Sequence, residues 1–179
     1  MEKNNIKKLC LSAVLAAFCF AMDYATTALE QVSGGTFKLS LSALPIIISA
    51  VCCGPLWGAA TGFVGTFMTQ LITYGFTPTT ILWVLPAAIR GLSVGLLFIA
   101  FRRSVKYYWL MLEIIISALL VTAANTLVIF IDSKLYNYYS PAVVFGSLGI
   151  RLVSAVITSV IFALIMPPII KIIKKHIIK

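Results

Sequence analysis

Residues 39–89 contain no charged side chain, and this uncharged run constrains the fold more than any other feature of the sequence. A membrane-spanning helix needs about 20 mostly apolar residues. The run is therefore long enough for two spans and the start of a third. Charged residues make up 11% of the whole chain, against about 25% in an ordinary soluble domain. The sequence predicts an all-α integral membrane protein without a second, soluble domain.

Turn and charge signals divide the chain into six predicted spans. Gly54-Pro55 marks a turn between the second and third spans, and Arg102-Arg103 stop the fourth. The spans are predicted at about 6–29, 39–53, 56–74, 79–101, 107–131 and 142–170, and they form one membrane domain over residues 1–179. The fold class is therefore a six-transmembrane-helix bundle.

Several spans carry features that affect their ends. Pro45 is expected to distort the short second span, Asp132 to stop the fifth, and Pro167-Pro168 to end the sixth. The first span resembles a signal peptide, with lysines before apolar residues 9–22. We expect it to be retained, because its apolar segment is longer than a usual signal sequence.

The basic residues predict which way the chain crosses the membrane. Cytoplasmic loops carry an excess of lysine and arginine. With both termini cytoplasmic, only Lys38 and Lys134 lie outside, and three clusters lie inside: residues 3–8, 102–106 and 171–179. The net charge of +9 is thus explained by topology. Nucleic acid is not expected as a partner, because binding it needs a continuous exposed basic face.

Arg90 and Arg151 lie inside predicted spans. A charge at mid-bilayer depth costs about 2.5–3.5 kcal/mol even on the most lenient scale. Counting about 1.5 Å per helical residue, Arg90 lies about 18 Å and Arg151 about 30 Å above the cytoplasmic surface. They either pair structurally, with Asp23, Glu113 or helix-end carbonyls, or bind an anionic ligand, because guanidinium groups bind carboxylate and phosphate bidentately.

Other polar and aromatic residues collect in the same outer half of the predicted bundle. The arrangement predicts a cup open to the outside, since a channel would place polar residues through its full depth. The aromatic residues either stack on a flat ligand ring or form the ordinary interfacial belt. The candidate ligand-binding residues are Lys38, Tyr74, Trp83, Arg90, Asn125 and Arg151.

Small residues recur at helical spacing in two places. Ala13, Ala17 and Ala21 form a smooth stripe on the first span, where another helix can approach closely. That stripe either packs inside the bundle or docks a separate membrane subunit. Glycines at residues 54, 58 and 62 repeat the spacing, and we expect them to allow tight packing of spans two and three.

Motifs for catalysis and metal binding are missing from the sequence. It has one histidine, His176 in the basic tail, and no paired carboxylates or closely spaced acids for a metal site. We therefore expect neither an enzyme nor a bound cofactor or metal. Glu113 and Asp23 are the only support for an intramembrane enzyme or a purely structural partner. The four cysteines are interpreted as small buried apolar residues.

The whole chain resembles the S components of energy-coupling factor (ECF) transporters, the small subunits that capture vitamins. The resemblance rests on six spans, on the alanine stripe, and on residues 42–50 followed by the glycine-rich segment 54–65. Within this group, residues 74–80 look most like the folate-type members. Folate or a related pterin is therefore the favoured substrate, and pantothenate, a thiamine precursor and riboflavin are alternatives.

The resemblance implies a mechanism and partners. An S component binds its vitamin from outside, and the first outer loop, here about 30–38, closes over the site. The loaded protein docks through Ala13, Ala17 and Ala21 onto a membrane scaffold subunit, and two cytoplasmic ATPases drive uptake. The expected location is the bacterial plasma membrane. A stand-alone carrier or channel is the main alternative from a different class.

Overall fold

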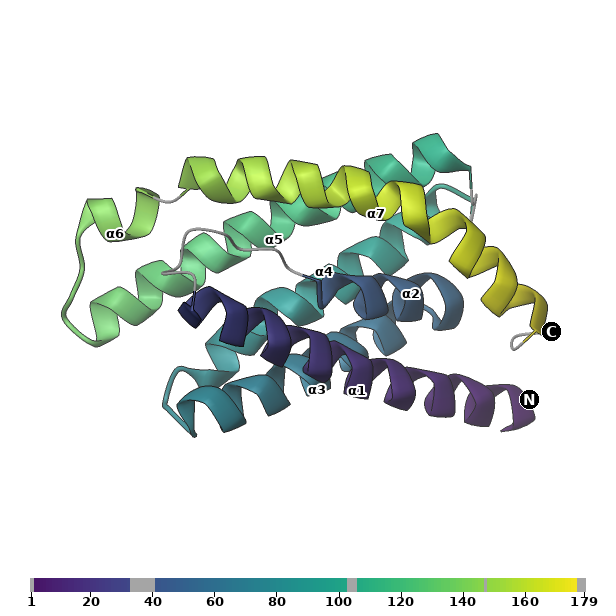
Figure 1. Ribbon diagram of the computed structural model, residues 1–179, viewed down its shortest axis with the longest axis horizontal. Coiled ribbons are helices and arrows are strands. Elements are labelled where there is room, and N and C mark those ends of the chain that lie inside the picture. Colours follow the sequence, from purple (N-terminus) through teal and green to yellow (C-terminus); the bar gives the residue numbers. More distant parts are fainter. Residues whose placement is uncertain (1, 33–40, 103–105, 147, 177–179) are drawn as a thin grey trace.

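The computed structural model describes residues 2–32, 41–102, 106–146 and 148–176 (Figure 1). These ranges contain helices and short connections but no strand, which confirms the all-α prediction. Lys38 and most of the loop 30–38 lie outside the described residues. The helices are α1 (Glu2–Val32), α2 (Ala43–Cys53), α3 (Pro55–Tyr74), α4 (Thr80–Ala100), α5 (Tyr107–Leu135), α6 (Pro141–Phe145) and α7 (Leu148–His176).

Four helical segments in the described part are long and apolar enough to cross a membrane. They are Asn5–Leu29, Thr80–Ala100, Tyr107–Leu135 and Pro141–Ile173. Helix α2 is apolar but short. Helix α3 has 20 residues, but its glycines, threonines and Gln70 make it less apolar. The chain is therefore a multi-pass membrane protein, and the six-span count stays a prediction.

Several helix ends differ from the predicted span ends. Helix α5 continues past Asp132 to Leu135, and α7 continues through Pro167 and Pro168 to His176. Proline inside a helix removes one hydrogen bond and bends the axis without always ending it, and Figure 1 shows that α7 bends toward its C-terminal end. Pro45 lies in the first turn of α2, where its missing N–H breaks no helical hydrogen bond. The last predicted span corresponds to two helices, α6 and α7.

The five long helices form an open ring around α2. Successive members of the ring pack against one another: α1 on α3, α3 on α4, α4 on α5, and α5 on α7. Helices α1 and α7 do not contact each other within the described ranges, and each contacts α2 instead. Figure 1 shows α2 between them. Because α2 has only 11 residues, it fills only part of the depth of the ring.

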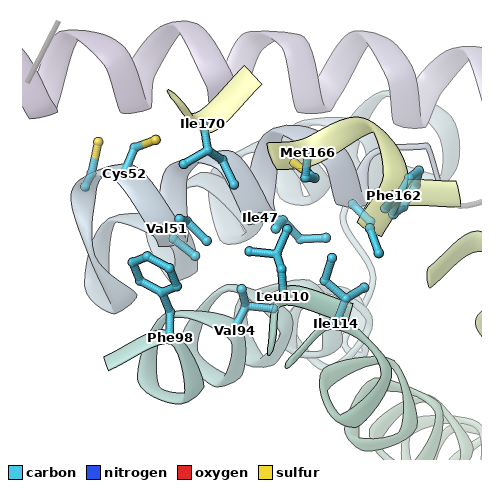
Figure 2. Close-up of a cluster of buried hydrophobic side chains, with 14 residues drawn as sticks. Ile47, Val51, Cys52, Val94, Phe98, Leu110, Ile114, Phe162, Met166 and Ile170 are labelled. Atoms are coloured by element: carbon cyan, nitrogen blue, oxygen red, sulfur yellow. The ribbon is translucent and has the colours of Figure 1, made fainter. Parts of the chain in front are cut away.

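The half of the ring that contains α2 is filled by an apolar core. Side chains of α2 pack against the C-terminal halves of α4 and α7 and the start of α5. Figure 2 shows Val51 and Ile47 facing Phe98, Val94 and Leu110 across this core. All are nearly inaccessible. This apolar packing closes the bundle at the end where α1 begins and α7 ends (Figure 1).

Glycines bring α3 close to its neighbours. A Cβ atom on Gly91 of α4 would lie 2.2 Å from the carbonyl carbon of Gly58 on α3. A Cβ atom on Gly58 would lie 2.5 Å from the Cβ of Ala50 on α2. Such backbone contact requires glycine. The predicted close approach of spans two and three is present, and α4 takes part in it as well.

Candidate ligand-binding cavity

A cavity of about 650 Å³ occupies the half of the ring that α2 leaves unfilled. Its wall comes from α1, α3, α4, α5 and α7, and Ala43 and Ile47 of α2 contribute where the cavity meets the apolar core. The volume falls in the range of about 300–1,000 Å³ that small-molecule sites occupy. The cavity is therefore a candidate binding site for a metabolite-sized ligand.

Five of the six candidate residues from the sequence line this cavity. They come from four different helices or helix ends: Tyr74, Trp83, Arg90, Asn125 and Arg151. The sixth, Lys38, lies outside the described residues. Side chains that are far apart in the sequence thus converge on one space, as a binding site requires.

Asp23 and Arg90 provide opposite charges on the wall of the cavity. Asp23 projects from α1 and accepts a hydrogen bond of 2.9 Å from the Ser42 hydroxyl. The charges of Asp23 and Arg90 act on each other, although α1 and α4 do not pack together. Both residues line the cavity, Asp23 from α1 and Arg90 from α4, so opposite charges lie on its wall.

Arg151 is in a different situation. It projects from the start of α7 into the cavity, and its Nη1 atom is buried without a hydrogen-bond partner among the described residues. The sequence left open whether this arginine pairs structurally or binds an anionic ligand. The structure gives it a place in the cavity wall and no pairing carboxylate in the described ranges.

Asp132 anchors a small aromatic cluster at the end of α5. It accepts a hydrogen bond of 3.3 Å from the Trp83 indole and a short one from the Tyr138 hydroxyl. The second bond raises the pKa of Tyr138 to about 12. Asp132, Trp83 and Tyr136 line the cavity, while Lys134 lies over the rings of Phe130 and Tyr139. Asp132 thus fixes the orientation of the indole that faces the cavity.

Serine and threonine side chains cover much of the remaining wall. Several donate their hydroxyl proton to a backbone carbonyl of their own helix, for example Thr27 to Asp23 at 2.8 Å and Thr122 to Ala118 at 2.8 Å. A hydroxyl whose proton is used in this way still offers oxygen lone pairs to a ligand. The residues that share this arrangement are Thr26, Thr27, Thr69, Thr122, Thr158 and Ser159.

These hydroxyls and Asp132 are not among the candidate site residues predicted from the sequence. Their spacing in the sequence could have indicated them. Thr26 and Thr27 follow Asp23 by three and four positions, and Thr69 and Gln70 follow Thr66 in the same way. Polar residues at this spacing share one face of a helix. A polar stripe on an otherwise apolar helix marks the side that faces a cavity.

Metal binding has no evident site here, because no group of three or more histidine, cysteine, aspartate or glutamate side chains converges in the described part of the chain. Cys19, Cys52 and Cys53 are buried and Cys10 is exposed, all as free thiols.

A model of the ECF transporter, substrate-specific component family matches residues 7–175 of the chain. This match covers almost the entire sequence. The chain belongs to this family. Searches among curated proteins and among solved structures returned no match. A substrate-specific component binds the substrate of a transporter, and the cavity between the helices of this ECF component is of the size such a task requires.

The alanine stripe of this ECF component lies on the outer face of α1. Ala13, Ala17 and Ala21 are all exposed, whereas Ser12, Ala16 and Cys19 on the same helix are buried. Of the two interpretations of the stripe, packing inside the bundle does not fit this exposure. The stripe is available to a helix outside the chain.

Proposed function

We propose that this chain captures a vitamin from outside the cell for ATP-driven uptake, with folate or a related pterin favoured. The observation that carries the proposal is the polar cavity lined by Arg90, Arg151, Asn125 and Trp83, which is closed at one end by the apolar core. A cavity that is closed toward one side of the membrane is suited to capture.

The chemistry of the wall favours a pterin-like ligand. A pterin has a flat ring that can stack on Trp83 or Tyr74, and its amino and ring N–H groups can donate to the threonine oxygens. The carboxylates of folate match an arginine fork. Pantothenate, a thiamine precursor and riboflavin remain the alternative substrates, because each would also use part of this wall.

We further propose six spans with both termini in the cytoplasm of a bacterial cell and the cavity facing outward. Two features support this topology. Both termini lie at the same end of the bundle (Figure 1), as an even number of spans requires. Lys8, Arg102, Lys106 and Lys171 belong to that end, in agreement with the excess of positive charge inside.

Energy for uptake is proposed to come from partner subunits. The sequence has no phosphate-binding loop with the lysine that such loops require. We propose that the exposed Ala13, Ala17 and Ala21 dock a membrane scaffold subunit, which connects the chain to two cytoplasmic ATPases. Small residues suit this contact because they allow close helix approach within the bilayer.

Mass spectrometry of the small molecule that co-purifies with the chain tests the proposed function. We expect a folate or another vitamin at near-equal molar ratio, released on denaturation. Cells that express the chain together with its energising subunits should accumulate that molecule, and cells that lack the chain should not. A co-purifying sugar, peptide or metal ion would contradict the proposal.

A further inference from the structure

Four charged side chains line the cavity in the described structure, two acidic and two basic: Asp23, Asp132, Arg90 and Arg151. The protein's own charges therefore balance. A ligand with a net negative charge must then bind at a basic side chain whose charge is not offset by a neighbouring acidic group of the protein.

Three of these four groups already interact with the protein. Asp23 and Arg90 act on each other's charge, and Ser42 donates to Asp23. Asp132 accepts from Trp83 and Tyr138. A buried, hydrogen-bonded polar group contributes little to new binding, because its partners have replaced the water that it lost.

Arg151 differs from the other three. No described carboxylate lies within ion-pair distance of it, and its buried Nη1 makes no hydrogen bond to the described residues. A charged donor that is buried without a partner is costly, so a ligand oxygen placed there recovers more free energy than at Arg90. Ser154 lies one turn further along α7 and also lines the cavity. Arg151 and Ser154 are three positions apart, so they share a face of the helix.

We propose that Arg151, assisted by the Ser154 hydroxyl, binds the acidic group of the ligand, and that Arg90 is a positioning residue held by Asp23. The inference rests on the proposed function. It adds the position of the ligand's acidic group, which lies at the Arg151 end of the cavity. The donor-bearing ring of the ligand then extends toward the threonine oxygens and Trp83.

Matched pairs of acidic and neutral probes test this assignment. We would measure binding by calorimetry for folic acid and its bis-amide, and for pantothenate and the alcohol pantothenol, with riboflavin and thiamine as probes without a carboxylate. In the unmodified protein, the acid of at least one pair should bind about 10- to 100-fold more tightly than its neutral partner, as expected for a charge-assisted hydrogen bond.

The Arg151→Gln variant should remove this preference by weakening the acid alone. Arg151→Lys keeps the charge but loses the bidentate fork, so the preference should fall only partway; this variant also serves if the glutamine variant does not fold. Lys134→Gln is the matched control, because Lys134 is an outer basic residue that packs on Phe130 and Tyr139 rather than in the cavity wall. It should keep the full preference.

The outcomes separate this inference from the proposed function. An unchanged acid preference in both Arg151 variants overturns the inference alone, as does tight binding of riboflavin or thiamine without binding of any acid. Failure of every probe to bind, together with no vitamin in the purified protein, overturns the proposed function and the inference with it.

Discussion

Arg90 and Asp23 are the residues whose removal should have the largest effect on the folded protein. Arg90→Ala removes a positive charge that acts on Asp23 in the cavity wall, and a carboxylate that loses a nearby opposite charge in a partly buried site is destabilising. We expect a clear loss of thermal stability in detergent, and binding weaker by about 2–3 kcal/mol for acidic and neutral probes alike. Circular dichroism melting curves and calorimetry measure the two effects.

A double variant distinguishes charge compensation from a general packing defect at Arg90. Asp23→Asn removes the carboxylate that would be left alone, so the Arg90→Ala, Asp23→Asn protein should recover a large part of the lost stability. The recovery is the coupling free energy of the pair. Additive losses in the double variant would show that the two charges do not compensate each other.

Tyr138 is a second test at the residue scale. Its hydrogen bond to Asp132 favours the protonated phenol and raises its pKa to about 12, from about 10 for a free tyrosine. Because the folded-state pKa is the higher one, the contribution to stability is complete below about pH 10 and is lost as the pH rises through about 12. The difference in tyrosinate absorbance between the protein and Tyr138→Phe should show a step near pH 12. A step near pH 10 would mean that Asp132 does not hold this hydroxyl.

The residues of the cavity could be predicted only in part from the sequence. Arg90, Trp83 and Asn125 were predicted because charged, aromatic and amide side chains are conspicuous within apolar spans. Asp23 was named from the sequence as one of several possible partners of Arg90, but the sequence could not select it, because α1 and α4 do not pack against each other. The different situation of Arg151 likewise depends on which groups surround it in space, where none of the described carboxylates forms an ion pair with it; sequence spacing does not report this.

At the scale of the element, the exposed stripe on α1 predicts a separation of binding from transport. Ala17→Trp places a large ring where a partner helix would approach closely. Since Ala17 faces away from the cavity, we expect unchanged vitamin binding and no uptake in cells with the energising subunits. Leu164→Trp on α7, also exposed, is the control and should transport normally. Normal uptake by the Ala17→Trp protein would exclude docking through this stripe.

Close packing of α3 and α4 makes a second prediction at this scale. Gly91→Ala should destabilise the bundle, because the new Cβ would lie 2.2 Å from the carbonyl carbon of Gly58 and both backbones must shift. Gly149→Ala in α7 is the matched control, since a Cβ there meets nothing within 4 Å and alanine favours a helix by up to about 1 kcal/mol. Melting temperatures should therefore move in opposite directions. Equal shifts would mean that this close approach is not tight.

Helix ends were the least predictable feature of the elements. Pro167 and Pro168 predicted an end, yet α7 continues through them to His176. In a membrane protein, neighbouring helices and local adjustments can satisfy the carbonyls that proline frees. The predicted end at these prolines is therefore wrong, because local propensity does not include what the neighbouring helices supply.

At the scale of the whole molecule, the length of α2 explains why there is a cavity at all. Eleven residues span about 16 Å at 1.5 Å per residue, roughly half of the hydrocarbon thickness of about 30 Å. The five helices of the surrounding ring are longer, so the space beyond the end of α2 is not filled by it. The sequence predicted a short second span and a cup in one half of the bundle. It did not predict that the shortness of this span produces the cup.

The closed half of the ring predicts that the chain alone binds without transporting. Its core of Ile47, Val51, Phe98, Leu110 and their neighbours is nearly inaccessible, so in the described part of the chain apolar packing separates the cavity from the other end. Purified chain in liposomes should therefore retain its vitamin without moving it to the lumen, and reconstitution with the scaffold and ATPase subunits should produce ATP-dependent uptake. The Ala17→Trp protein in the same reconstituted system is the control, since it should bind but not transport. Counterflow of vitamin by the chain alone would require a second arrangement of this core and would establish a stand-alone carrier.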